Sequence, residues 1–452
     1  MQIIKIAVIC CITKFPWLTL WPNGIDCDKN NLYFDKGSGK TNKNKLSMKR
    51  KAFLQTLNLG IISATLYSGR SYGIFLKDLL DRNNDDNELS YHRIQDIRFS
   101  TVQLKYPRLV GKNARLNLHG YGPEVTICSI RTDKGAMGWA SLRGSRQEAE
   151  QIASRLIGKK VSELFASQVG TINDNHIAFD IALHDLAGVI LQKPVYELLG
   201  NKNPFTTDYY SGMIYFDDLE PSDKPAGIDR ILEECHYDYN VGYRQFKLKI
   251  GRGHKWMPFQ QGLKRDIEVT KAVAAAFPDC GILVDGNNGF TIDQFIDYLK
   301  GISSVNLFWI EEPFHETVAD YQKLKNYIQT EGINTLLADG EADPNPALLK
   351  ELFTKKLLDV HLTDIEGLGF TNWRRLMPEL KNLGAQASPH AWGSLLKSYY
   401  TAHLAGGLGN TVTIEGITST SEDVDLSGYS IKAGKLIPPS SPGFGMTLLK
   451  KI

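Results

Sequence analysis

The stretch "YRQFKLKIG", residues 243–251, places two lysines in an apolar segment with one residue between them. If this segment is a strand, its side chains alternate between two faces, so Lys247 and Lys249 share one face and their apolar neighbours occupy the other. Lysines on a strand normally extend to water. The apolar flanks here are typical of a strand covered on both sides, so the lysines need acidic partners nearby.

Seven further runs in residues 205–420 have the same strand-like character and are separated by helix-like stretches. In chain order the eight runs are "DYYSGMIYF", "QFKLKIG", "GILVDGNNG", "LFWIEEPF", "TLLADGE", "LLDVHLTDIEG", "GAQASPHAWG" and "TVTIEG". Such alternation predicts a parallel sheet built from βα units. Eight units over roughly 210 residues fit a (β/α)8 TIM-type barrel.

Polar residues follow nearly every run, at the end of the strand where this fold builds its active sites. Successive positions after Lys249 are separated by 36, 26, 30, 23, 26 and 25 residues, close to one barrel unit each. Three carboxylates that converge would repel by several kcal/mol each, and a divalent cation removes that repulsion. Oxygen ligands without cysteine or histidine suit Mg²⁺. The set comprises Lys247, Lys249, Asp285, Glu311, Glu341, Asp364, His390 and Glu415.

The segments on either side of the barrel have a different pattern. Residues 91–204 begin with alternating strand-like stretches and continue with helix-like spacing, which predicts an α+β domain. Residues 421–452 are strand and turn again, and we expect them to return to that domain. The fold class is therefore α/β, with a (β/α)8 barrel and an α+β N-terminal domain completed by the C-terminal segment.

Composition excludes some functions. The chain has 452 residues, 42% of them hydrophobic and 23% charged, and a formal net charge of +2. This balance is that of an ordinary globular protein and does not favour a nucleic-acid partner. Outside the N-terminal segment the cysteines are Cys128, Cys235 and Cys280, an odd number without CxxC spacing, which argues against a disulfide framework and a zinc site.

Residues 1–90 are predicted to be a leader and linker. From Met48, "MKRKAFLQTLNLGIISATLYSGRS" has the basic start, apolar stretch and small residues of an export signal. The motif "RKAFLQ" resembles a twin-arginine signal with Lys51 at the second arginine position. This predicts a periplasmic protein. A frayed amphipathic helix in a cytoplasmic protein is the alternative, Met48 is a candidate true start, and the apolar stretch is too short for a membrane span.

In this order and spacing, "FKLKIG", "VDGNNG", "WIEEPF", "ADGE", "TDIEGLGF" and "SPHAWGS" together resemble the enolase superfamily, mandelate racemase subgroup, over about residues 90–450. The first-domain stretch "DIALHDLAG…PVYELLG" adds to the resemblance. It implies that residues 91–204 cap a barrel that binds Mg²⁺. It also implies abstraction of the proton alpha to a substrate carboxylate, with stabilisation of the resulting enediolate.

The resemblance also assigns roles to residues. Lys249 matches the base, and Lys247 matches the auxiliary lysine that contacts the substrate carboxylate or lowers the pKa of its partner. The acids Asp285, Glu311 and Glu341 match the metal ligands. Asp364 and His390 match an acid/base dyad on the opposite face, and Glu415 matches a group that hydrogen-bonds the substrate carboxylate.

Two further residues are predicted from the sequence around them. Asn287, in "VDGNNG", is expected to support the metal or the substrate. Arg108, in "LKYPRLVGKNARLN", is a candidate contact for a polyhydroxy acid, or else part of a basic surface turn. Asp339 is expected to be structural and paired with a lysine.

Two bases on opposite faces allow two reactions. One is dehydration of an acid sugar, a hydro-lyase reaction, and the other is racemisation or epimerisation of a hydroxy acid. A catalytically silent exported binding protein is a third hypothesis, whereas a barrel hydrolase would need early histidine ligands that the sequence lacks. The expected partner is a small carboxylate, with no nucleic acid and no stable membrane span, and the resemblance implies a homo-oligomer.

Overall fold

The computed structural model describes residues 25–27, 31–34, 46–49 and 85–452. Contacts divide the chain into two units, Met1–Asp81 and Arg82–Ile452. The first contains three antiparallel strands, β1 (Ile25–Cys27), β2 (Asn31–Phe34) and β3 (Leu46–Lys49). Apart from its first two residues, which belong to β3, the stretch that resembles an export signal lies outside the described residues.

The second unit begins with the α+β domain. A three-stranded antiparallel sheet has the order β4 (Ile94–Gln103), β5 (Glu124–Thr132) and β6 (Met137–Ser141). Most of helix α5 (Asp180–Leu191) is buried, as its largely apolar sequence requires, and it packs on β6, where the Asp185 carboxylate accepts a hydrogen bond from the Trp139 backbone. The remaining elements are α4 (Arg146–Ala153), η1 (Val161–Glu163), β7 (Phe165–Ala166), β8 (Gly170–Thr171), η2 (Asp174–Phe179) and α6 (Val195–Leu198).

Eight parallel strands follow and form a barrel, which confirms the predicted fold class. Each strand pairs with the next along the chain, β16 pairs back onto β9, and a bridge between Ala387 and Thr411 links the last two strands. The strands are β9 (Thr207–Ile214), β10 (Gln245–Lys249), β11 (Gly281–Asp285), β12 (Leu307–Glu311), β13 (Leu336–Asp339), β14 (Val360–His361), β15 (Gln386–Ala387) and β16 (Thr413–Gly416).

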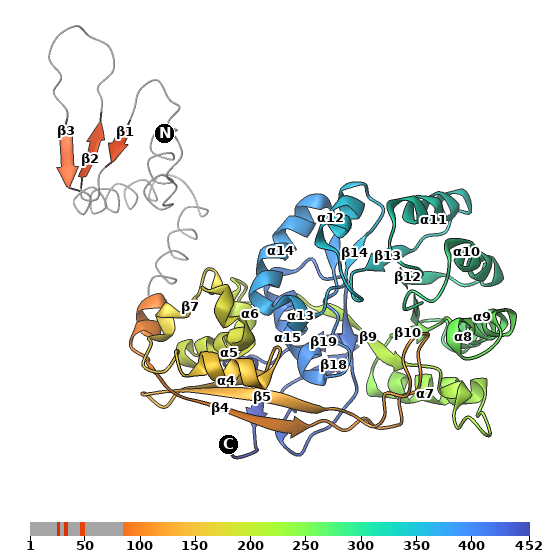
Figure 1. Ribbon diagram of the computed structural model, residues 1–452, viewed down its shortest axis with the longest axis horizontal. Helices are drawn as coiled ribbons and strands as arrows, with labels where there is room; N and C mark the ends of the chain where they lie inside the picture. Colours follow the sequence, from red (N-terminus) through yellow and green to blue (C-terminus); the bar gives the residue numbers. More distant parts are fainter. Residues whose placement is uncertain (1–24, 28–30, 35–45, 50–84) are drawn as a thin grey trace, which may run out of the picture. The chain divides into compact units, whose positions relative to one another are not determined.

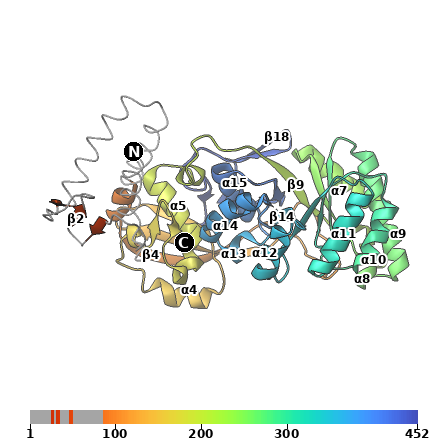
Figure 2. The same ribbon diagram turned by 90° about the horizontal axis from the view of Figure 1, so that it is seen from above.

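Helices surround these strands on the outside (Figures 1 and 2). Their apolar faces pack on the barrel, as the spacing of apolar residues requires. They are α7 (Ile228–Val241), α8 (Arg252–Lys255), α9 (Phe259–Ala276), α10 (Ile292–Gly301), α11 (Val318–Thr330), α12 (Pro346–Thr354), α13 (Ile365–Leu368), α14 (Phe370–Leu383) and α15 (Leu395–Leu408), with η3 (Asp217–Leu219) after β9.

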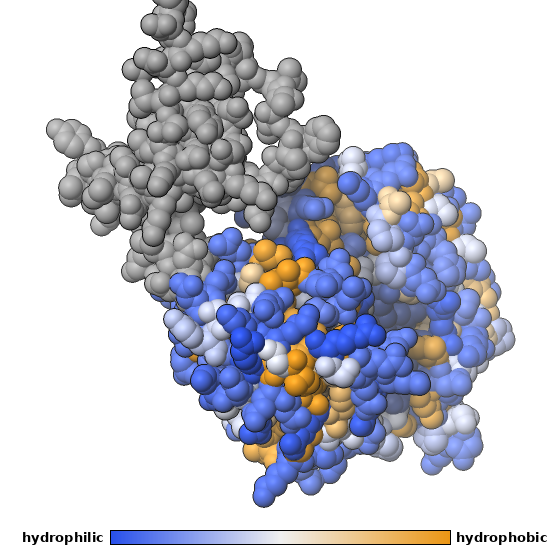
Figure 3. Space-filling view, turned by 60° about the vertical axis from the view of Figure 1, so that its left-hand side comes forward, coloured by the Kyte–Doolittle hydropathy of each residue, from blue (hydrophilic) through white to orange (hydrophobic). Residues whose placement is uncertain are grey.

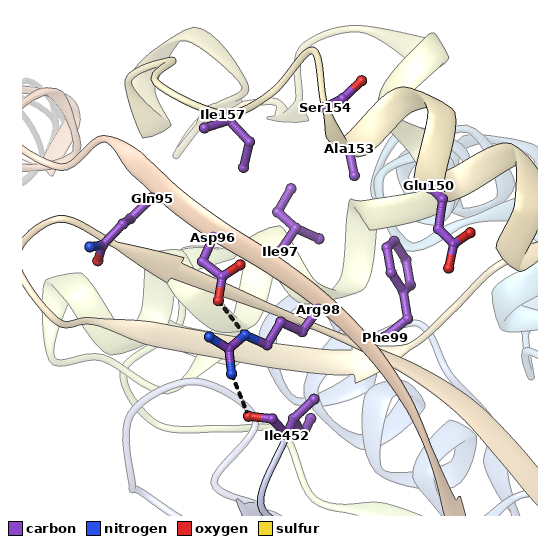
Figure 4. A pocket seen from close by; sticks show the side chains of 10 residues that line it. All are labelled: Gln95, Asp96, Ile97, Arg98, Phe99, Glu150, Ala153, Ser154, Ile157 and Ile452. Atoms are coloured by element: carbon purple, nitrogen blue, oxygen red, sulfur yellow. Dashed lines mark hydrogen bonds and ion pairs between the residues drawn. The ribbon is translucent and has the colours of Figure 1, made fainter.

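The C-terminal segment contacts both parts of this unit. Its hairpin of β18 (Ser430–Lys432) and β19 (Lys435–Ile437) extends the barrel sheet beside β9, and β17 (Val424–Asp425) pairs with β20 (Thr447–Leu448). At the chain end, Arg98 of β4 donates a hydrogen bond to the carbonyl of Ile452, at a groove between β4 and α4 (Figure 4). The segment thus fastens the α+β domain to the barrel.

The face drawn in Figure 3 is mostly hydrophilic, with apolar residues in scattered groups. Among the described residues, no helix combines the length and apolar character that a membrane span needs.

Candidate active site

Strand register brings the predicted residues of the first strands to one level. Lys249 of β10 lies opposite Asp285 of β11, and Asp285 lies opposite Glu311 of β12. All five residues of β10 are buried, so both lysines are enclosed as their apolar surroundings predict. Because side chains alternate along a strand, Lys247 points to the same side as Lys249, one layer deeper.

The buried lysines are paired with carboxylates. Lys247 Nζ lies 3.0 Å from Glu311 Oε1, 2.9 Å from Glu415 Oε1 and 3.5 Å from Asp285 Oδ2. Lys249 donates a short hydrogen bond to Asp285 Oδ2. This network supplies the acidic partners that two enclosed ammonium groups require.

The predicted metal ligands converge. Asp285, Glu311 and Glu341 each offer an oxygen, and these oxygens lie within 4.8 Å of one another. Glu311 Oε2 and Glu341 Oε2 are buried without a hydrogen-bond partner in the described part of the chain. Buried, unpaired carboxylate oxygens in an all-oxygen set fit a hard divalent cation.

Charge within the cluster shifts its pKa values. Burial and the nearby Asp285 raise the pKa of Glu311 well above its usual value, as expected of carboxylates brought together. Burial has the largest effect on the pKa of Lys249 and lowers it, but Asp285, Glu341 and Glu311 together outweigh burial and leave that pKa raised. Lys247 lowers the pKa of Lys249, as predicted, but its effect is smaller than that of the surrounding carboxylates.

Asp364 and His390 form the predicted dyad at the other end of the cluster. His390 Nδ1 lies 3.1 Å from Asp364 Oδ2, and His390 Nε2 lies 3.2 Å from Glu341 Oε1. Asp364 is held in place because its Oδ1 caps the short helix α13. Burial lowers the pKa of His390, but Glu341, Glu415 and Asp364 outweigh it and raise that pKa. The imidazole is therefore favoured in its protonated form.

Glu415, on β16, joins the two ends of the cluster. Its Oε1 pairs with Lys247, and its Oε2 accepts a hydrogen bond of 2.8 Å from the Ala391 backbone and lies 3.7 Å from His390 Nε2. Gly212 on the neighbouring strand makes room for it, because a Cβ there would lie 2.6 Å from Glu415 Oε1. Asn287 follows β11, where its backbone donates to Asp285 Oδ1 and its own Oδ1 is buried without a hydrogen bond to any described residue.

Comparison with known proteins agrees with this geometry. Residues 230–452 match the family model "Enolase C-terminal domain-like". The chain is similar to a galacturonate dehydratase from Geobacillus sp., with 32% identity, a TM-score of 0.75, and coverage of 80% of this chain and 94% of that one; that structure is a mutant complexed with Mg. Another structure of that dehydratase holds D-galacturonate and 5-keto-4-deoxy-D-galacturonate. An arabinonate dehydratase from Saccharolobus solfataricus is 24% identical over 78% of this chain and 96% of its own length.

The chain belongs to the enolase superfamily, mandelate racemase subgroup. Similar members of this superfamily are lyases, such as the dehydratases, and isomerases, such as an N-succinylamino acid racemase from Thermus thermophilus that is 27% identical over 42% of this chain and 47% of its own length.

The structure does not bring Arg108 to this enolase-type cluster. Its guanidinium forms a bidentate pair with Asp238 of α7, at 2.9 and 2.8 Å, and lies 3.7 Å from Glu234. A substrate contact by Arg108 stays a prediction that the structure does not support, because both Nη atoms bind Asp238 while the buried Nε forms no hydrogen bond with a described residue. Asp339 also differs from expectation: it accepts a hydrogen bond from the Tyr321 hydroxyl and pairs with no lysine among the described residues.

Sequence reasoning missed several residues near the site. Lys397 of α15 lies 2.9 Å from Asp364 Oδ2, and Tyr215, just after β9, lies with its ring centroid 5.2 Å from Lys249 Nζ. His119 of the capping domain packs against both Tyr215 and Trp392. Tyr215 lies near the end of a predicted strand, so its place at the site could have been predicted. The sequence around Lys397 and His119 has no pattern that predicts their place there.

Proposed function

We propose that this protein is a Mg²⁺-dependent acid-sugar dehydratase. The observation that carries the proposal is the placement of two proton carriers at opposite ends of the carboxylate cluster. Lys249 contacts Asp285 at one end, and His390 lies 3.2 Å from Glu341 at the other. Two carriers that flank one bound carbon can remove a proton and supply another without a large movement.

The proposed cation site consists of Asp285, Glu311 and Glu341. A bound Mg²⁺ would act as a Lewis acid that stabilises negative charge on the substrate carboxylate. Its positive charge would also offset the negative charges of Asp285, Glu341 and Glu311, which raise the pKa of Lys249. Lys249 would then be closer to the neutral form that a base requires.

The chain's own residues then account for each proton. Neutral Lys249 removes the proton alpha to the carboxylate, while Lys247 lies beside it as a fixed positive charge that favours the enediolate. Protonated His390 donates its proton to the departing β-hydroxyl, which leaves as water. The remaining enol then tautomerises to a ketone: its hydroxyl proton is lost to solvent, and the carbon that bore the departing hydroxyl takes up a proton from solvent. Asp364 keeps the imidazole oriented throughout.

The similar galacturonate dehydratase supports a hexuronate as the substrate class. In galacturonate the carbon alpha to the carboxylate is C5 and the β-hydroxyl is on C4, so this chemistry yields a 5-keto-4-deoxy acid. That compound is the one found in the neighbouring structure beside D-galacturonate. Aldonates are the second substrate class, because arabinonate and D-xylonate dehydratases are similar at 24% and 22% identity.

Epimerisation is the runner-up. The same two carriers could exchange one proton across a carbon, and a hydrophobic dipeptide epimerase is similar at 24% identity over 52% of this chain and 65% of its own length. The silent binding protein is disfavoured by the intact network of buried acids and bases, because such a network destabilises a fold that does not use it.

Product analysis with purified protein and Mg²⁺ tests the proposal. D-galacturonate, D-glucuronate, D-arabinonate and D-xylonate are incubated separately, and the products are identified by NMR. We expect a keto-deoxy acid from at least one, lost with His390→Asn and retained with His315→Asn, which changes an exposed histidine. An inverted but hydroxylated acid would favour epimerisation, and unchanged acids throughout would contradict the proposed function.

We further propose that the protein is exported through the stretch that begins at Met48. The support is its basic, apolar and small-residue order in the sequence. Cell fractionation with and without Arg50→Gln and Lys51→Gln tests it: the proposal expects the unmodified chain outside the cytoplasm and the variant within it, and retention of both in the cytoplasm would contradict it.

We also propose a homo-oligomer, on the basis of the family resemblance alone. Light scattering of the purified chain tests this, and a mass near 50.6 kDa would contradict it.

A further inference from the structure

The capping-domain loop of residues 106–120 lies on the barrel at the mouth of the site. The Tyr106 hydroxyl donates to the Gly393 carbonyl at 2.9 Å, and Trp256 Nε1 donates to the Asn113 carbonyl at 2.6 Å. The Phe216 backbone, just after β9, donates to the Lys112 carbonyl at 2.9 Å. Three separate parts of the barrel therefore hold the loop in one position.

Within this loop, His119 is fixed in one tautomer. Its Nδ1 lies 2.8 Å from the carbonyl oxygen of Gly111. A carbonyl oxygen only accepts hydrogen bonds, so Nδ1 carries the proton and Nε2 of the neutral ring is an acceptor. Burial lowers the pKa of His119, which keeps the ring neutral near pH 7. No described residue forms a hydrogen bond with Nε2.

The ring of His119 also has a defined place relative to the proton carriers. It packs edge-on against Tyr215 and Trp392, with centroid distances of 4.7 and 5.4 Å. Tyr215 in turn lies with its centroid 5.2 Å from Lys249 Nζ, and Trp392 follows His390 by two residues. His119 is thus anchored to aromatic groups that adjoin both Lys249 and His390.

We propose that His119 is a substrate-recognition residue whose Nε2 accepts a hydrogen bond from a hydroxyl of the acid sugar, a role that rests on the proposed function. A polyhydroxy acid held by its carboxylate at the cation site carries hydroxyl groups on its remaining carbons, and His119 packs on Tyr215, whose ring centroid lies 5.2 Å from Lys249 Nζ. An acceptor fixed in direction by Gly111 favours a hydroxyl donor and disfavours an apolar substituent at the same place.

A purely structural role would need only the shape of the ring. The contacts with Tyr215 and Trp392 are ring contacts that phenylalanine would keep. Both variants lose the hydrogen bond from Nδ1 to Gly111. Glutamine keeps an acceptor, because it places its side-chain oxygen near the position of Nε2, whereas phenylalanine has none. Phenylalanine and glutamine therefore separate packing from hydrogen bonding.

The experiment compares wild type, His119→Phe and His119→Gln on the acid that the wild type dehydrates fastest, with Mg²⁺ present. We expect His119→Phe to lower kcat/KM by about 10- to 100-fold, mainly through KM, and His119→Gln to stay within about fivefold of wild type. Thermal unfolding should be similar for all three proteins, since the loop is held by other residues.

Two results would overturn the proposal. Wild-type kcat/KM in His119→Phe would show that Nε2 contacts no substrate, and equal losses in both variants would show that an acceptor at that position is not what matters. A wild type that dehydrates no acid is a different result, because it removes the proposed function itself and with it the basis of this role.

Discussion

At the scale of single residues, Lys249 and the proposed cation compete for Asp285. The ammonium group of Lys249 donates to Asp285, which is also a proposed metal ligand. A carboxylate oxygen that binds a cation cannot hold the ammonium group equally well. Metal binding is therefore expected to weaken the contact between Lys249 and Asp285. That contact stabilises the two buried charges when no cation is bound.

Replacing Lys249 should separate metal binding from catalysis. We expect Lys249→Met to lower kcat by at least about 100-fold, because the base is lost. Affinity for Mg²⁺ should stay equal or increase, because Asp285 loses its competing cation. Calorimetric titration with Mg²⁺ and a turnover assay check the two effects, with Lys264→Met at an exposed position as the control. A variant that lost metal affinity along with activity would contradict this account.

Lys397 is expected to set the pH range of the dyad. Its Nζ lies 2.9 Å from Asp364 Oδ2, the oxygen that also faces His390. Lys397→Met would leave the negative charge of Asp364 acting on His390 alone, which raises the pKa of His390 further. Because His390 must be protonated to act as an acid, the alkaline limb of the pH–kcat profile should move to higher pH. An unchanged or lowered limb would speak against His390 as the acid.

At the scale of elements, strand register explains why the site could be predicted. Lys249, Asp285 and Glu311 end successive strands at one level, so chain spacing alone indicates their convergence. Lys397 and His119 could not be found this way, since one is on a helix after the seventh strand and the other is in a capping-domain loop. Their positions depend on tertiary packing. The pair of Arg108 with Asp238 could not be predicted either, because the two residues are 130 positions apart in the sequence.

The close approach of β9 and β16 gives a prediction at this scale. A Cβ at residue 212 would lie 2.6 Å from Glu415 Oε1, so Gly212→Ala must displace the carboxylate from Lys247 and His390. We expect kcat/KM to fall at least about tenfold and stability to fall by about 1–3 kcal/mol. Gly281→Ala on β11 is the control, because its nearest neighbour is the side chain of Gln245 at 3.1 Å. Full activity in Gly212→Ala would show that the position of Glu415 is not critical.

For the whole molecule, function depends on the attachment of the capping domain to the barrel. The C-terminal segment and the loop of residues 106–120 both make this attachment, through backbone pairing, ring contacts and buried charge. The order of strands and helices could be predicted from apolar spacing, since each βα unit has its own pattern. No sequence pattern predicts how the loop of residues 106–120 packs on the barrel mouth, because the residues that contact each other there are far apart in the sequence.

Arg108 tests the attachment. Removing it would leave Asp238 as a buried carboxylate without its cation, so we expect Arg108→Met to reduce the free energy of unfolding by about 3–5 kcal/mol. The double variant Arg108→Met/Asp238→Asn should recover part of that loss, and Arg155→Met, at an exposed arginine, should have little effect. Chemical denaturation measures all three. A stable Arg108→Met protein with a raised KM would instead support Arg108 as a substrate contact, a role that its pairing with Asp238 does not favour.

The proposed site removes the proton alpha to a carboxylate with the help of a cation. NMR of deuterium incorporation at that carbon, with D₂O, Mg²⁺ and D-galacturonate or another acid sugar, tests this step. We expect exchange or elimination that requires Mg²⁺, stops with EDTA and is lost in Lys249→Met. An acid sugar that is bound in the presence of Mg²⁺ but whose alpha proton never exchanges and whose β-hydroxyl never leaves would contradict it.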